Sequence, residues 1–121
     1  MTCPFCGDGL NILRENELAY AIYDKYPVSR GHILIIPKRH VSSYFDTTPE
    51  ERPAMEALLD ESKTLLAETH SPGGYNIRIN VGQAAGQTIF HVPLHVTPRY
   101  EGDLDDLRGG VTGVIPEKRI Y

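Results

Sequence analysis

The most informative stretch of the chain runs from Gln87 to Arg99 and reads Gln-Thr-Ile-Phe-His-Val-Pro-Leu-His-Val-Thr-Pro-Arg. From His91 onward an aliphatic residue stands at every second position, with His, Pro and His between them, which is the period of a strand with one buried face. The pattern predicts a strand over residues 89–97 whose buried side chains are Val92, Leu94 and Val96. His91, Pro93 and His95 then share the opposite face. Two imidazoles on one strand face indicate phosphate chemistry or metal binding.

The rest of the sequence predicts an α+β fold with an antiparallel sheet of about five strands and one main helix. The other expected strands cover residues 10–14, 18–23, 32–37 and 75–81, the first two joined by a turn at 15–17. The helix begins near Thr48, which forms a capping-box pattern with Glu51. Met and Leu residues at helical spacing over 55–66 predict a face packed on the sheet, and the helix ends at residues 71–74. The tail from about 99 to 121 is expected to be irregular because Gly, Pro and charged residues dominate it.

The bulk properties predict a single small domain over residues 1–121. A domain of this size gains from dimerisation, because a small chain buries a limited fraction of its surface. The net charge of −4 argues against a nucleic-acid partner. No apolar run is long enough for a membrane span, and no basic and apolar leader precedes Cys3, so a cytoplasmic location is expected.

Cys3 and Cys6 are the only cysteines, and their Cys-x-x-Cys spacing has three interpretations. A redox pair would be expected before a helix in a thioredoxin-like unit, a pattern that this chain lacks. A structural disulfide would suit an oxidising compartment. A zinc site needs two further ligands, and His40 and His91 both lie at or just after expected strands.

The whole pattern resembles the histidine-triad (HIT) family of nucleotide hydrolases and transferases. The family signature is His-apolar-His-apolar-His-apolar-apolar after a Gly-Gln-Ser/Thr turn, which here is Gly86-Gln87-Thr88. The resemblance covers nearly the whole chain, and it implies a two-fold homodimer that binds a purine nucleotide. Further matches in order and spacing are Asp24, Gly31-His32, residues 33–37, Lys38-Arg39-His40, Asn80, Gly82 and Gly86.

The resemblance also implies roles for individual residues. Zinc-bearing members of the family bind Zn²⁺ structurally through the residues that correspond to Cys3, Cys6, His40 and His91. His32 corresponds to the imidazole that orients the nucleophile, and His95 to the one that contacts the phosphate. Asp24 corresponds to the carboxylate that accepts both ribose hydroxyls. The neutral groups expected around the α-phosphate are Asn80, Gln87 and Thr88.

Pro93 occupies the position of the family's nucleophile, the middle histidine. In the family mechanism that imidazole attacks the α-phosphorus to form a nucleotidyl-histidine, which water or a sugar phosphate resolves. Proline cannot attack phosphorus, and in a central strand it would also remove a ladder hydrogen bond. Three explanations stay open: a nucleotide binder that has lost catalysis, a repositioned His95 that acts instead, or an engineered or incidental substitution in an active enzyme. Two functions therefore stay open. The first is a hydrolase of phosphoramidates or dinucleoside polyphosphates that is impaired at position 93, and the second is a non-catalytic module that binds a nucleotide.

Overall fold

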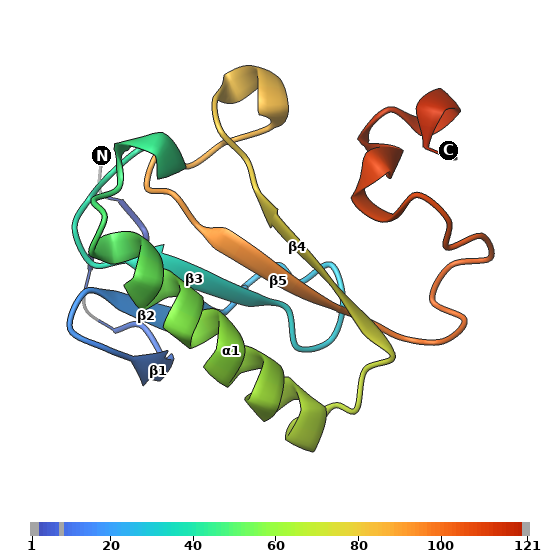
Figure 1. The fold of residues 1–121 in the computed structure, drawn as a ribbon, viewed down its shortest axis with the longest axis horizontal. Helices are drawn as coiled ribbons and strands as arrows, with labels where there is room; N and C mark the ends of the chain where they lie inside the picture. The colour runs from blue at the N-terminus through green and yellow to red at the C-terminus, as the bar shows by residue number, and fades with distance from the viewer. Residues whose placement is uncertain (1–2, 8, 120–121) are drawn as a thin grey trace.

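The fold is a five-stranded antiparallel sheet with one long helix across one face (Figure 1). The computed structural model describes residues 3–7 and 9–119. The strand order is β1-β2-β3-β5-β4. The strands are β1 (Ile12–Glu15), β2 (Ala19–Tyr23), β3 (Ile33–Pro37), β4 (Gly74–Ile79) and β5 (Leu94–Arg99), and the helix α1 is Glu51–Thr69. None of the described helices has the length and apolar character needed to cross a bilayer.

The expected hairpin is present, with β1 beginning two residues later than the sequence indicated. The side chain of Asn16 accepts hydrogen bonds from the backbone N–H groups of Leu18 and Ala19, at 3.1 and 3.0 Å. An Asn side chain that bonds to nearby backbone amides in this way favours a tight turn. Asn16 thus supplies the turn that the sequence placed at 15–17.

The strand predicted over residues 89–97 is corrected, because β5 begins only at Leu94. Burial still follows the predicted alternation, since Val92, Leu94 and Val96 all lie in the interior. Pro93 has no N–H, so it is tolerated just before the first strand residue and not inside the ladder. β5 pairs with β3 and β4 from Leu94 onward, so Pro93 removes no hydrogen bond from either ladder.

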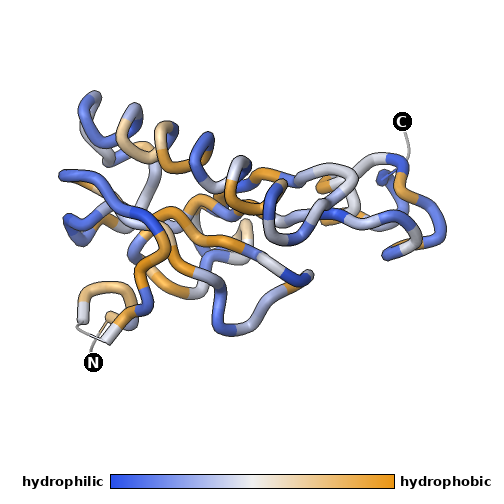
Figure 2. Tube along the Cα trace, turned by 90° about the horizontal axis from the view of Figure 1, so that it is seen from below, coloured by the Kyte–Doolittle hydropathy of each residue, from blue (hydrophilic) through white to orange (hydrophobic). Residues whose placement is uncertain are grey.

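Helix α1 begins with the predicted capping box. The Glu51 backbone N–H donates to Thr48 Oγ1 at 3.1 Å, and the Thr48 N–H donates to the Glu51 carboxylate at 2.8 Å. Both bonds satisfy amides that have no partner within the helix. The predicted apolar stripe packs on the sheet as core, against buried residues of β2, β3 and β5. Figure 2 shows hydrophobic residues gathered in the strands beneath the helix.

The opposite face of the sheet carries the polar and aromatic groups of interest. Tyr20, Ile22, Leu34 and Ile36 form a second buried cluster there, against which Phe5 packs. Cross-strand pairing places Leu34 of β3 opposite His95 of β5, and His95 opposite Arg78 of β4. Directly paired residues project from the same side of a sheet. One row across three strands therefore presents an apolar side chain, an imidazole and a guanidinium.

The tail after β5 is irregular, as predicted, apart from short 3-10 turns at Gly110–Val114 and Pro116–Lys118. Arg99 and Asp103 pair at 2.8 Å at its start. Figure 1 shows the tail beyond the edge strand β4, away from α1.

Candidate functional site

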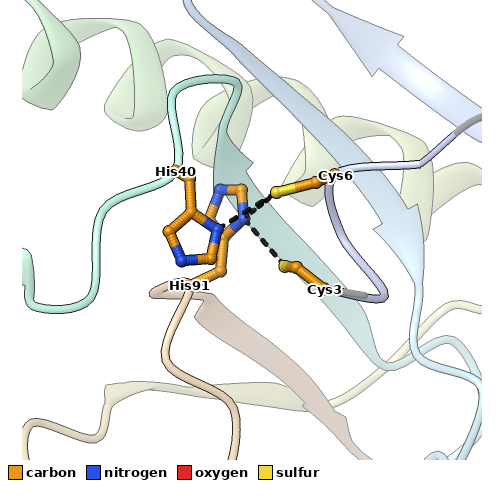
Figure 3. Close-up of side chains that lie close together, drawn as sticks. All are labelled: Cys3, Cys6, His40 and His91. Atoms are coloured by element: carbon orange, nitrogen blue, oxygen red, sulfur yellow. Dashed lines mark hydrogen bonds between the residues drawn. The ribbon is translucent and has the colours of Figure 1, made fainter. Parts of the chain in front are cut away.

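The four predicted metal ligands converge in space although they come from three distant parts of the chain (Figure 3). His91 Nδ1 lies 3.3 Å from Cys3 Sγ and 3.2 Å from Cys6 Sγ, and His40 Nδ1 lies 3.1 Å from Cys6 Sγ. All four ligand atoms lie within 4.8 Å of one another. Both cysteines are free thiols, so the disulfide interpretation receives no support.

The donor set fits a zinc ion in its chemistry as well as its spacing. Tetrahedral zinc with ordinary Zn–S and Zn–N bonds separates sulfur from nitrogen by about 3.5 Å. His91 is fully buried, and its Nε2 lies 2.7 Å from the Pro37 carbonyl oxygen. A carbonyl only accepts, so Nε2 carries the ring proton and Nδ1 presents a lone pair to the cysteines. This second hydrogen bond is how metal-binding histidines are normally oriented. The cluster can therefore hold a metal ion.

The second group of interest lines a cavity of about 290 Å³ on the face opposite α1. Its walls include Pro93, His95, Asp24 and Arg78. A neighbouring cavity of about 590 Å³, largely apolar, shares Asp24, Tyr26, Leu34, Phe5 and Ile89 with it. His91 does not line either cavity but belongs to the metal cluster. The histidines that the sequence placed on one face therefore lie in two separate groups, His91 with the cysteines and His95 in the cavity wall.

A chain of hydrogen bonds fixes the ring protons in this cavity. The Val28 backbone N–H donates to His32 Nδ1 at 3.1 Å, so Nδ1 is unprotonated. The proton of neutral His32 then lies on Nε2, which donates to His95 Nδ1 at 3.0 Å. Neutral His95 consequently carries its proton on Nε2. Asp24 Oδ2 lies 3.5 Å from His32 Nε2, and Asp24 Oδ1 accepts the Tyr26 N–H at 2.9 Å.

Both imidazoles are held neutral near pH 7. Burial, the positive charge of Arg78 and the neighbouring His32 lower the pKa of His95 to about 4. Burial also lowers the pKa of His32, against the opposing effect of the Asp24 carboxylate. A neutral His95 can donate from Nε2, but neither ring nitrogen offers a free lone pair. His95 is thus arranged as a hydrogen-bond donor.

Asp24, His32 and His95 also lie close enough together to surround a metal ion. Their hydrogen bonds argue against that role. A neutral His32 that bound metal through Nε2 would need its proton on Nδ1, where the Val28 N–H already donates. Ligating histidines ordinarily donate from the second nitrogen. The metal cluster at the cysteines is therefore the better candidate.

The neutral groups expected around the phosphate all line the same cavity. Gln87, however, is buried, and backbone groups occupy its amide: Nε2 donates to the carbonyls of Ile89 and of Ser42, which lies in another loop, and Oε1 accepts the Gly82 N–H. Gln87 therefore shapes the loop, while Asn80 and Thr88 have the exposure that a ligand contact needs. Sequence reasoning missed Arg78, a strand residue for which the only available signal was a charged side chain between Ile77 and Ile79.

Comparison with known proteins agrees with this architecture. The HIT domain model matches residues 10–102. A 16.1 kDa HIT-like protein of Mycoplasma pneumoniae is 41% identical over 108 residues, covering 84% of this chain and 74% of the relative. A zinc-bound histidine triad family protein from Mycobacterium smegmatis has a TM-score of 0.71 and 41% identity, over 80% of this chain and 70% of that one.

The chain therefore belongs to the HIT family. A more distant relative with a stated activity is an AP-4-A phosphorylase of Mycobacterium tuberculosis, 33% identical over 113 residues. That match covers 91% of this chain but 57% of the phosphorylase, so the chain spans little more than half of that enzyme.

Proposed function

We propose that this protein binds a purine nucleotide in the Pro93–His95 cavity and is of the phosphoramidate and dinucleoside polyphosphate hydrolase type, with its covalent step impaired because Pro93 replaces the nucleophile. The observation that carries the proposal is that Pro93 and His95 line one cavity, with the Nδ1 lone pair of His95 already engaged by His32. A nucleophilic imidazole needs a free lone pair facing phosphorus. Neither residue offers one.

The remaining groups suit a nucleoside phosphate. Asp24 lies where the two cavities meet, and a carboxylate there has two acceptor oxygens for ribose hydroxyls. The larger cavity is mainly apolar and has room for a base, while His95 Nε2–H, Asn80 and Thr88 supply neutral donors for phosphate. The cysteine and histidine cluster would hold structural Zn²⁺.

A homodimer is the proposed assembly. Within residues 3–7 and 9–119, edge strand β4 pairs with β5 alone, and it carries Ile77, which is 50% exposed. An unpaired strand edge is a template on which a strand of another chain can pair. The alternative function is a non-catalytic module that binds the same purine nucleotide and acts through this dimer surface; it predicts no turnover at all, whereas an impaired hydrolase predicts slow turnover.

Calorimetry with AMP, combined with turnover assays on adenosine 5′-phosphoramidate and diadenosine tetraphosphate, tests the proposal. We expect AMP to bind with a Kd between micromolar and millimolar, about −8 to −4 kcal/mol, with AMP release far below that of a complete triad. Asp24→Ala should weaken binding by about 1–3 kcal/mol, because a charged acceptor is lost. An absence of binding at millimolar AMP would refute the proposal, and rapid AMP release would refute its catalytic half.

A further inference from the structure

Arg78 is a charged group that the family pattern and the predicted nucleotide contacts leave without a role. It lies on β4 directly opposite His95, and its side chain lines the same cavity as Pro93 and Asp24. It is the only lysine or arginine among the described residues that line this cavity. Its position in the sheet is fixed by the pairing of β4 with β5.

The guanidinium has little to neutralise it within the part of the chain that the structure describes. Its one side-chain hydrogen bond is a long one, 3.4 Å to Thr97 Oγ1, and none of the ion pairs found among residues 3–7 and 9–119 includes it. Asp24 is the one carboxylate among the described residues of the cavity wall; it forms none of those ion pairs with Arg78, accepts the Tyr26 N–H and lies 3.5 Å from His32 Nε2. The charge of Arg78 is therefore available to a ligand.

The other groups of the cavity wall supply no further positive charge for a bound phosphate. A phosphate dianion that leaves water needs a cation or several donors to replace its hydration. His95 and His32 are neutral near pH 7, because burial lowers the pKa of each. The donors at Asn80 and Thr88 are neutral too. Arg78 is consequently the one full positive charge among the described residues of the wall.

We propose that Arg78 is the phosphate anchor and that the cavity selects the dianionic 5′-phosphate of a nucleoside monophosphate over phosphate esters and amidates. The inference rests on the proposed nucleotide site and adds the ligand class to it. A monophosphate carries nearly two negative charges at neutral pH, whereas an ester or amidate carries about one. A planar guanidinium holds two phosphate oxygens in a fork, and its attraction grows with the charge that it faces. A site of this kind retains the product-like nucleotide instead of turning over an ester.

Calorimetry at pH 7.5 and low salt, with adenosine, AMP and AMP methyl ester, provides the test. The unmodified protein should bind AMP about 10-fold more tightly than the methyl ester. Arg78→Gln should weaken AMP binding about 10- to 100-fold, leave adenosine binding unchanged and abolish the discrimination. Arg78→Lys should keep part of the AMP affinity, because it keeps the charge and loses the fork.

Arg14→Gln is the matched control, because it removes the same charge from an exposed position on β1, at the far edge of the sheet. It should bind all three ligands as the unmodified protein does. Unchanged adenosine binding and thermal midpoint in the Arg78 variants show that they are folded. If Arg78→Gln binds AMP and methyl ester as the unmodified protein does, the anchor role is overturned and the nucleotide site stands. Full AMP affinity in Arg78→Lys would overturn the two-oxygen fork. If the unmodified protein binds none of the three, the nucleotide site itself is overturned.

Discussion

Pro93→His should convert a binding site into a catalytic one. Position 93 faces the same cavity as His95, so a new imidazole there would adjoin the expected phosphate site. Removing the nucleophile of a well-studied serine hydrolase costs about 10⁶-fold in rate. Restoring one beside an intact His32–His95 pair should raise AMP release from adenosine 5′-phosphoramidate by at least about 10³-fold, equivalent to about 4 kcal/mol of barrier.

The stability cost of this change is small. The ladders of β5 begin at Leu94, so a histidine N–H at position 93 neither restores nor breaks a ladder hydrogen bond. Replacing proline increases the conformational entropy of the unfolded chain, which should lower the free energy of unfolding by about 0.4–1 kcal/mol. Urea unfolding of both proteins measures this difference directly.

Pro93→Gln is the control for this experiment, because it removes the proline ring and adds a polar side chain without a nucleophile. Single-turnover kinetics should show the gain in Pro93→His only. Intact mass under mildly alkaline denaturing conditions should show a nucleotidyl adduct in that variant alone. Equal rates of AMP release by the unmodified protein and Pro93→His would refute the assignment of Pro93 to the nucleophile position. If Pro93→His binds AMP but stays as inert as Pro93→Gln, the loss of catalysis extends beyond this residue.

Three further predictions concern metal, assembly and acid stability. Purified protein should contain about one zinc per chain by elemental analysis, and Cys6→Ala should lose the metal and several kcal/mol of unfolding free energy; metal-free protein from a chelator-free preparation would contradict this. Light scattering at micromolar concentration should give twice the 13.5 kDa chain mass, and a monomeric mass would exclude the dimer. The free energy of unfolding should fall by about 1–3 kcal/mol as the pH is lowered from 6.5 to about 4. The pKa of His95 is lowered to about 4 in the folded protein, so the unfolded chain binds the proton at a higher pH than the folded one. His95→Asn should flatten that part of the pH profile of stability, and an unchanged slope would contradict the burial of a neutral imidazole.

The sequence predicted most of the fold because its strongest patterns are local. The capping box at Thr48 and Glu51 and the apolar stripe of α1 depend on residues three or four apart, and both appear as expected. The start of β5 was predicted wrongly for a local reason too. Alternation continued through His91, but a proline at 93 cannot donate to a ladder, so the strand begins after it.

Some residues of the candidate sites were predicted from the sequence and others were not, because side-chain partners are set by tertiary contacts. Cys-x-x-Cys and two histidines indicated a metal cluster, and the structure brings all four together. The alternation of His91 and His95 placed both on one face, and the family resemblance assigned His91 to the metal and His95 to the phosphate. In the structure His91 lies with the cysteines and His95 lines the cavity. Arg78 could not be assigned from sequence, because its importance comes from cross-strand pairing with His95.

The arrangement around Pro93 explains how a nucleophile can be absent while its surroundings persist. Residues 89–93 lie outside the strands, and His91 at their centre is anchored by the Pro37 carbonyl and directed toward the cysteines. His95 is held separately, within β5 and by His32. Position 93 therefore lies between two independently fixed groups and donates no ladder hydrogen bond. Under the proposed function, a proline at this position would remove the reacting nitrogen without disturbing the cysteine and histidine cluster or the sheet, while Arg78, Asn80 and Thr88 still line the cavity.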